Sequence, residues 1–291
     1  MQSTMVIQGR ETSTSDIHVI KELVTAHPHW HRTRISRELC RLWNWRNTNG
    51  QLKDMACRTF LLKLERAGHI ILPKRRREAA NHSRGKSVVA VEHSTEAISC
   101  NLKSLAAIKI SLVDPRSERH CLFNYFLSSY HYLGYKTPVG ENMKYMILDR
   151  FGRPLSCVLF GSAAWKTAPR DEFIGWSHQL REKNVNNITN NTRFLILPWV
   201  KVPHLASHIL GNVSQRISKD WMAKYGHTVS LLETFVDRSR FRGTCYKAAN
   251  WILTGQTKGR TRNDRYNNIR TPIKDVYVYP LIRDFRKQLS Q

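Results

Sequence analysis

The chain has 291 residues, and its 47 Lys and Arg residues against 22 Asp and Glu residues give a formal net charge of +25. Because such an excess repels itself unless a polyanion neutralises it, nucleic acid is the expected partner and an anionic membrane surface the second candidate. The sequence has no apolar run of about 18 residues and no long basic helix with a clean apolar face. A membrane partner is therefore not expected.

Residues 1–15 are polar and lack the charged-then-apolar pattern of a secretory signal. The six cysteines are scattered without CxxC pairs, which argues against zinc ribbons and against a disulfide framework. These features predict a protein of the reducing cytoplasm. The hydrophobic content of 41% is ample for real cores, and the length favours one small and one large domain.

The N-terminal part has a helical pattern that is clearest where Leu52, Met55, Ala56, Phe60 and Leu64 repeat before Gly68. The expected elements are helices over Ile17–His27, Arg34–Trp45 and Leu52–Ala67, a short strand over His69–Pro73 and a basic tip at Lys74–Arg77. Three helices, a strand and a basic tip predict a winged helix-turn-helix domain over residues 1–77.

In a winged helix the third helix enters the major groove and the wing touches the DNA backbone. The predicted DNA contacts are therefore the cations of these two elements: Lys53, Arg58, Lys63, Arg66, Lys74, Arg75, Arg76 and Arg77. The alternative is a three-helix unit that binds protein or caps the larger domain.

Residues 78–100 are predicted to be a linker because they begin with small and polar side chains. A second domain is expected over residues 101–291. Its predicted elements, in chain order, are a stretch over Leu102–Val113, a helix over Cys121–Tyr132, a hairpin of Met143–Leu148 and Leu155–Phe160, a central strand over Thr192–Val200, a helix over His204–Tyr225, a strand over Val229–Asp237, a short helix over Gly243–Ile252 and a strand over Lys274–Leu281. This order predicts a mixed α/β domain.

Several motifs resemble the DruA-like family, which is named after the Druantia anti-phage defence system and also occurs among mobile-element genes. They are Ser36–Cys40, Leu52–Cys57, His131–Tyr135, Asn190–Trp199, Leu232–Asp237 and Gly243–Trp251. The resemblance implies a role in phage defence or DNA mobility and no settled chemistry.

The order of elements in the second domain resembles the GNAT acyltransferase fold, in which a helix after the central strand binds the pyrophosphate of acyl-CoA. Tyr246–Trp251 is similar to the tyrosine-bearing helix end of that fold, which would place Tyr246 as a general acid. Between Trp199 and Ser207, however, the chain lacks the glycines that let a backbone approach phosphate. Acyl-CoA is therefore not the favoured cofactor, and the likeness leaves open both an acyltransferase and a scaffold without CoA.

Glu233 and Asp237 are the carboxylates most suited to chemistry, since both point to one face of a predicted strand. At roughly 13 Å apart they cannot share one metal ion. Glu233 lies in an apolar strand, where a carboxylate must be paired or have its pKa raised. The alternative to a catalytic role is a salt bridge, for which Arg193 on the preceding strand is the predicted partner.

Tyr246 is a candidate general acid or a nucleophile on phosphate, and the alternative is packing against Trp251. His131 opens the motif His-Tyr-Leu-Gly-Tyr at a predicted helix end, where a side chain can project into a cleft.

His29-Trp30-His31 matches the pattern of metal-dependent nicking enzymes only weakly, because it precedes the helical domain. The cofactor stays unknown, with a divalent metal ion left open.

Two further segments have the composition of nucleic-acid contacts. The amides Asn186, Asn187, Asn190 and Asn191, with Trp165, Arg170 and Trp176, suit stacking and backbone contacts on unpaired bases, or form an ordinary loop. The loop Thr257–Arg265 carries Lys258, Arg260, Arg262 and Arg265 and suits phosphate contacts.

The leading hypothesis is a DNA-binding defence protein that recognises or processes invading DNA, with a site made of Glu233, Tyr246, Asp237, Arg193 and His131. Two alternatives are a strand-cutting enzyme of transposase or nickase type and a GNAT-derived enzyme that modifies nucleobases. Double-stranded DNA, with single-stranded segments allowed, is the expected partner. Other defence or mobile-element proteins and an oligomer are left open.

Overall fold

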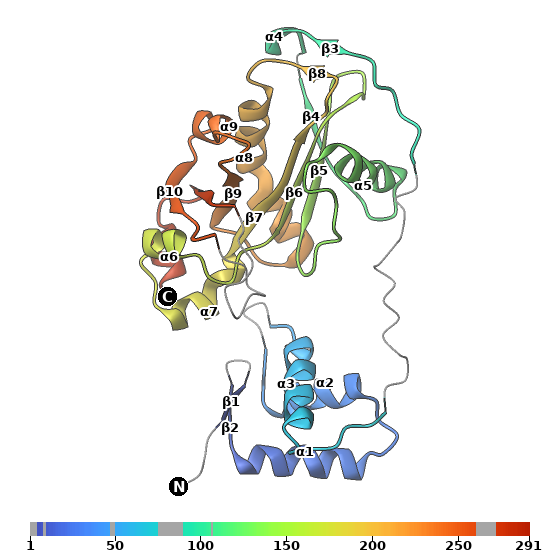
Figure 1. Cartoon of the computed structure of the whole chain (residues 1–291), viewed down its shortest axis with the longest axis vertical. Coiled ribbons are helices and arrows are strands. Elements are labelled where there is room, and N and C mark those ends of the chain that lie inside the picture. Colours follow the sequence, from blue (N-terminus) through green and yellow to red (C-terminus); the bar gives the residue numbers. More distant parts are fainter. Residues whose placement is uncertain (1–4, 8–9, 47–49, 75–89, 106, 260–271) are drawn as a thin grey trace. The chain divides into compact units, whose positions relative to one another are not determined.

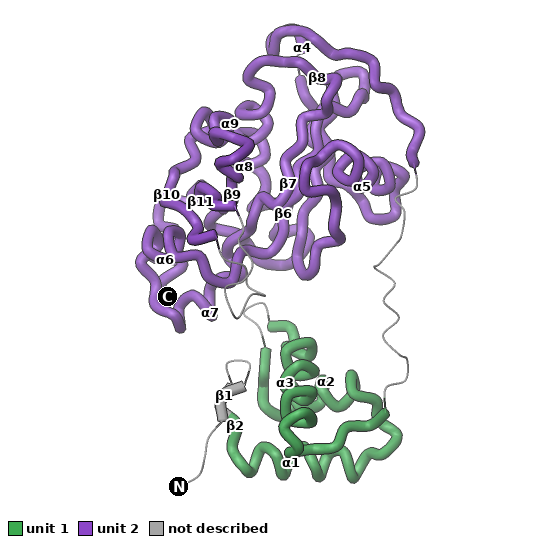
Figure 2. The backbone as a smooth tube through the Cα atoms, in the orientation of Figure 1, with its two compact units in different colours: residues 1–86 green, residues 87–291 purple. Residues whose placement is uncertain are grey.

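The computed structural model describes the chain apart from residues 1–4, 8–9, 47–49, 75–89, 106 and 260–271 (Figure 1). The chain divides into two compact units, residues 1–86 and residues 87–291 (Figure 2). Within the described residues, no helix is long and apolar enough to cross a membrane.

The first unit contains the predicted helices α1 (Thr14–Ala26), α2 (Arg32–Leu42) and α3 (Asp54–Arg66), preceded by a hairpin of β1 (Met5–Ile7) and β2 (Arg10–Thr12). Ser13 caps α1, since its hydroxyl accepts from the Asp16 amide while the Asp16 carboxylate accepts from the Ser13 amide. A core that includes Ile20, Leu39 and Phe60 holds the helices together. The helical pattern of the sequence therefore predicted the three helices of this unit correctly, and the hairpin was missed.

The strand predicted over His69–Pro73 is wrong, because these residues pair with no other strand among those described. Ile70 and Leu72 are buried in the helical core, whereas Ile71 between them is 87% exposed. Burial therefore alternates along this segment as it does in a strand, although no other strand pairs with it among the described residues. The Leu72 amide donates to Glu65, and the Pro73 carbonyl accepts from Arg32. The predicted wing therefore has no strand at its base, and Arg75, Arg76 and Arg77 lie outside the described residues.

The second unit is built on a seven-stranded mixed sheet in the order β10-β11-β9-β7-β6-β5-β4. Its strands are β4 (Lys109–Leu112), β5 (Met143–Leu148), β6 (Pro154–Ser162), β7 (Ile188–Ile196), β9 (Leu231–Asp237), β10 (Ile252–Gln256) and β11 (Lys274–Pro280). Neighbouring strands run antiparallel except β7 and β9, which are parallel. The mixed α/β prediction for this unit is confirmed.

Two helices, α5 (Glu118–Tyr130) and α8 (Leu205–Tyr225), cover opposite faces of the sheet. Successive residues of a strand point to opposite faces, and on β5 Lys144 bonds to His120 and Asn124 of α5 whereas Tyr145 bonds to Asp220 of α8. One large core cluster joins both helices to the sheet. The sequence had predicted both helices and the β5–β6 hairpin.

Several elements were not predicted: α4 (Leu102–Leu105), α6 (Ala168–Ile174), α7 (His178–Asn184), the 3-10 turn η1 (Val185–Asn187), β10 and α10 (Phe285–Leu289). A short parallel pair of β3 (Ile98–Ser99) and β8 (Val200–Lys201) was also missed, as was the separation of α9 (Thr244–Ala248) from β10. The end of the predicted linker is not free, since His93 stacks on Trp199 with 5.5 Å between ring centroids.

The parallel strands β7 and β9 part midway along their length. Their pairing runs from Ile188 opposite Leu231 to Asn191 opposite Thr234, and both strands continue beyond it. At this point β7 has a bulge against β6, where Leu159 faces Arg193 and Phe160 faces Asn191, so that Thr192 is the extra residue. A bulge bends its strand and ends pairing. The bend therefore opens a space between the outer halves of β7 and β9.

Candidate functional site

A cavity of about 670 Å³ occupies the space between the diverging halves of β7 and β9. Its walls come from five segments far apart in the sequence: the end of α5 with the turn that follows it, β7 from Asn190 onward, the first turn of α8, the end of β9 with the loop and the start of α9 (Thr244–Ala248) that follow it, and the start of β11. The lining includes Tyr130, His131, Tyr132, Asn190, Asn191, Arg193, Asp237, Arg240, Phe241, Arg242, Tyr246 and Lys274. The cavity thus brings together His131, Arg193, Asp237 and Tyr246 of the predicted site.

The cavity is cationic. Arg193, Arg240, Arg242 and Lys274 line it, and Asp237 is the one carboxylate among the described lining residues. Asp237 is engaged locally, because its Oδ1 accepts from the Ser239 amide at 3.0 Å and the Ser239 hydroxyl at 2.7 Å. The Ser239 hydroxyl is the main reason that the pKa of Asp237 lies below its usual value. Asp237 is therefore an anion that shapes the loop carrying Arg240 and Arg242.

Arg193 is fixed by the bulge itself. Its Nε donates to the Gly134 carbonyl at 2.8 Å and its Nη1 to the Thr192 carbonyl at 2.7 Å. The Asn191 amide and the Thr192 hydroxyl donate to the Leu159 carbonyl, which stabilises the irregular backbone on either side. Arg193 is thus held at the cavity wall, and burial lowers its pKa.

His131 is neutral at pH 7. Burial, aided by the positive charge of Arg193, lowers the pKa of His131 from 6.5 to about 4. Its Nδ1 accepts from the Leu133 amide at 3.1 Å, so the proton of the neutral ring is on Nε2. The donor of the neutral ring is therefore Nε2–H, and His131 is one of the residues that line the cavity.

Two exposed aromatic rings belong to the cavity lining. Tyr132 is 37% exposed and Phe241 is 49% exposed, and their ring centroids are 5.3 Å apart. The guanidinium of Arg240 lies 4.8 Å from the centre of the Tyr132 ring. The loop that carries Phe241 ends at Gly243, where a Cβ would lie 2.6 Å from the Tyr277 hydroxyl, so only glycine fits.

Tyr246 lies at the inner wall and is buried. Its hydroxyl donates to Asn191 Oδ1 at 2.7 Å, and its ring packs edge-on against Trp251. Burial raises the pKa of Tyr246, so its phenol stays protonated. This geometry matches the packing alternative, and it leaves Tyr246 poorly suited to attack phosphate, because a nucleophile needs an adjacent base or a lowered pKa.

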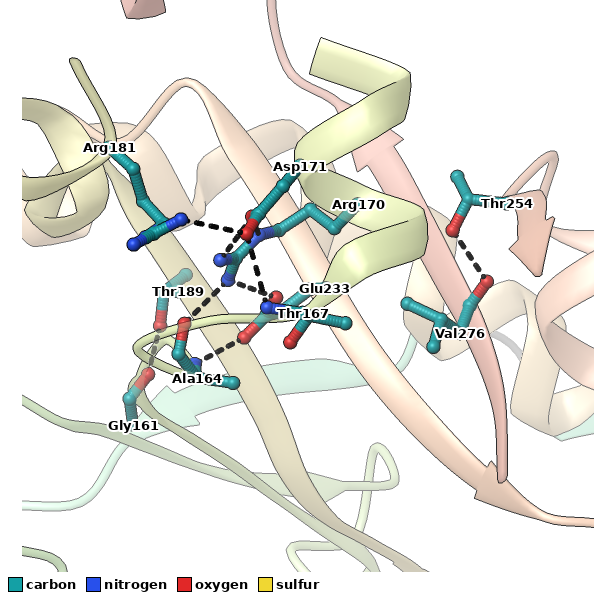
Figure 3. A network of polar contacts seen from close by, with 10 residues as sticks. All are labelled: Gly161, Ala164, Thr167, Arg170, Asp171, Arg181, Thr189, Glu233, Thr254 and Val276. Carbon is teal, nitrogen blue, oxygen red and sulfur yellow. Dashed lines mark hydrogen bonds and ion pairs between the residues drawn. The ribbon is translucent and has the colours of Figure 1, made fainter. Parts of the chain in front are cut away.

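Glu233 does not line the cavity but belongs to a buried charge network beside it (Figure 3). Its carboxylate accepts from Arg170 Nη1 at 2.8 Å and from the Ala164 amide at 2.6 Å, and both charged side chains are 0% exposed. Burial raises the pKa of Glu233, and the guanidinium of Arg170 opposes that shift. The predicted pairing of Glu233 with Arg193 is wrong: the partner is Arg170, which also bonds to Asp171.

Of the rings and the cation expected to stack on unpaired bases, only Trp165 is accessible. Arg170 is 0% exposed and Trp176 is 8% exposed, so neither is available to a base, whereas Trp165 is 47% exposed. Of the four predicted amides, Asn190 and Asn191 line the cavity. The His-Trp-His segment shows no metal-site geometry: His31 caps α2, and no three metal-ligating side chains gather anywhere in the described part of the chain.

The predicted cations outside the cavity divide into three groups. Lys53, Lys63, Arg66, Lys74 and Lys258 are exposed. Arg58 is paired with Asp54 of its own helix at 3.2 Å. Arg260, Arg262 and Arg265 lie outside the described residues, like the wing tip.

Sequence reasoning missed Tyr132, Arg240, Phe241, Arg242 and Lys274 as site residues. A signal was present in the segment Arg238-Ser-Arg-Phe-Arg242, where arginines flank an aromatic directly after a strand. The contribution of Lys274 follows only from the pairing of β11 with β9, which sets Lys274 opposite Asp237.

A model of the family described as Druantia protein DruA matches residues 63–274, which is more than half of the chain. A search of curated proteins found no match.

Solved structures similar to the chain include acetyltransferases. A spermidine/spermine N-acetyltransferase from Vibrio cholerae is 8% identical with a TM-score of 0.40, over 63% of this chain and 98% of that chain. A putative acetyltransferase from Acinetobacter baylyi is 10% identical with a TM-score of 0.38, over 60% of this chain and 93% of that chain. A putative phosphinothricin N-acetyltransferase is 10% identical with a TM-score of 0.38, over 61% and 100%. At these values no ligand or reaction is transferred to this chain.

We expect Arg170→Met to destabilise the second unit by about 3–5 kcal/mol, because it leaves Glu233 buried without a cation. Replacing both partners, as in Arg170→Met with Glu233→Leu, should restore part of that loss. The measurement is urea unfolding followed by tryptophan fluorescence. Arg238→Met is the control, since Arg238 is 54% exposed in its pair with Asp275 and should cost about 1 kcal/mol or less. Equal losses for Arg170→Met and the control would contradict the assignment.

The depressed pKa of His131 also predicts a pH dependence of stability. The unfolded chain protonates this ring near 6.5 and the folded chain near 4, so the unfolded state binds more protons between these values. The contribution of His131 is therefore full above pH 6.5 and is lost as the pH falls towards 4. A His131→Gln variant should show a smaller loss of unfolding free energy over this window. An NMR titration in which His131 protonates near 6.5 in the folded protein would refute the prediction.

Proposed function

Because the chain belongs to the family of the Druantia protein DruA, we propose that it is a cytoplasmic DNA-binding protein of anti-phage defence that recognises or processes invading DNA. The observation that carries the proposal is the cavity between β7 and β9, lined by four cations, one locally engaged carboxylate and two exposed aromatic rings. Such a lining suits a phosphate-bearing ligand with flat rings, and the net charge of +25 suits a polyanion.

The first unit supports the same proposal. Helix α3 buries Cys57, Phe60, Leu61 and Leu64 against the helical core. At 100° per residue these positions leave Thr59, Lys63 and Arg66 on the outer side, where all three are exposed. An exposed helix face with cations is the form in which helix-turn-helix proteins meet DNA, with or without a wing strand.

The geometry supports binding better than strand cutting. The two residues expected to carry cutting are otherwise engaged: Glu233 is paired with Arg170, and Tyr246 is a buried protonated phenol bonded to Asn191. No feature of the described cavity lining points specifically to base modification by acyl transfer.

The test of the proposal is a titration of the full chain with duplex DNA at several salt concentrations. Binding through many phosphates must weaken steeply with salt, by roughly 0.9 log units per log unit of salt for each phosphate contact. We expect a variant with Lys53, Lys63 and Arg66 all changed to Gln to lower this slope by about 2–3.

Lys219→Gln serves as the control, because Lys219 is an exposed lysine on α8 outside both predicted contact sets. It should leave the slope of the parent protein unchanged. A duplex affinity that does not respond to salt, or no binding to any DNA, would rule out the proposed function.

A further inference from the structure

We propose that the cavity between β7 and β9 receives one unpaired nucleotide of a DNA strand, with its base against Tyr132 and Phe241 and its phosphate against Arg240 and Arg242. The inference rests on the proposed function and goes beyond it by naming the state of DNA that the second unit selects. A cavity of about 670 Å³ lies within the usual range of roughly 300–1,000 Å³ for single small ligands. A base can enter such a cavity only after it leaves the duplex stack.

Stacking is the first contact that the lining offers. Tyr132 and Phe241 come from different segments, are both exposed, and have rings tilted by 59° at 5.3 Å. Large exposed aromatic rings are favourable platforms for bases, and each stacked base contributes about 1–3 kcal/mol. Arg240 lies over one face of the Tyr132 ring, which places a cation next to the pair of rings that the base would contact.

Hydrogen bonding to the edge of the base is the second contact. Asn190 Oδ1 is buried at the cavity wall and has no hydrogen-bond partner within the described part of the chain. A buried acceptor without a partner is costly, so the site is better satisfied when a ligand supplies a donor. The Nε2–H of neutral His131 offers the complementary donor. Flipped bases are recognised in this way, by hydrogen bonds to an edge and by stacking on a face.

The third contact is with phosphate. Arg240 and Arg242 are exposed in the loop after β9, and Lys274 enters the lining from β11. Ala206, in the first turn of the 21-residue helix α8, also lines the cavity, so the positive end of a long helix adds to the potential. Arg238, the first residue after β9, is exposed outside the cavity lining, which suits a ligand that continues beyond one nucleotide. This continuation favours a strand over a free nucleotide.

The experiment uses the fluorescent base 2-aminopurine, whose emission is quenched by stacking. Three probes are compared with the full chain: a duplex with 2-aminopurine in a one-nucleotide bulge, the same duplex with 2-aminopurine paired, and the free 2-aminopurine deoxynucleotide. We expect binding to quench the bulged probe and to be at least about tenfold tighter for the bulged than for the paired duplex. Tyr132→Ala and Phe241→Ala should each lower the affinity for the bulged duplex by roughly 5–150-fold, which corresponds to the free energy of stacking one base.

Phe151→Ala is the matched control. Phe151 is also an exposed ring, at 68%, with the guanidinium of Arg150 4.6 Å from its centre, and it does not line the cavity. It should leave the preference for the bulge unchanged. Tyr132→Phe and Phe241→Tyr keep the rings and should retain most of the affinity.

The outcomes separate this inference from the proposed function. Equal, salt-sensitive binding of bulged and paired duplexes without quenching would overturn the inference and leave DNA binding standing. Binding of the free nucleotide alone, lost in Tyr132→Ala, would keep a nucleotide site and overturn the part of both proposals that names DNA. No binding of any probe would overturn both.

Discussion

The candidate site depends on the point at which β7 leaves β9. Both strands are parallel neighbours for four residues, and the bulge at Thr192 then turns β7 away. Where two neighbouring strands of a sheet separate, their backbone N–H and C=O groups lose the partners that they had in the sheet. Asn191, Thr192 and Arg193 counter this, because their side chains bond to carbonyl groups at the bulge and beside it. Thr192 therefore forms the bulge that opens the cavity, all three side chains stabilise its wall, and Arg193 adds positive charge.

The charge network around Glu233 supports the sheet next to the cavity. Arg170 comes from α6 and bonds to the Ala164 carbonyl as well as to Glu233 and Asp171, so it ties the segment after β6 to the centre of β9. A buried ion pair of this kind adds little net stability over apolar packing, but removing one partner is expensive. We infer that the network fixes the position of β9, and with it the place where the loop with Arg240 and Phe241 starts.

The sequence predicted the long helices and most of the strands at the centre of the sheet, and it missed the short elements and the long-range contacts. A helix with a clear apolar repeat, such as α3, shows its period in the sequence. Short apolar runs rich in β-branched and aromatic residues, such as those of β6 and β9, indicate buried strands by their length and composition. The wing strand was mispredicted because Ile70 and Leu72 alternate as a strand does, although they pack on helices. The partner of Glu233 was mispredicted because Arg170 lies on a short helix that has no strong periodic signal. Tyr132 and Lys274 could not be assigned to the site, since only the folded sheet brings the turn after α5 and the start of β11 together.

The central claim is that the cavity between β7 and β9 contacts an unpaired nucleotide, and photocrosslinking tests it most directly. The probe is a duplex with one bulged 4-thiothymidine, irradiated in complex with the full chain, and the crosslinked peptide is identified by mass spectrometry. The structure predicts crosslinks at Tyr132 or within residues 240–243, and loss of them when the same base is paired. Crosslinks confined to residues that do not line the cavity would contradict the claim.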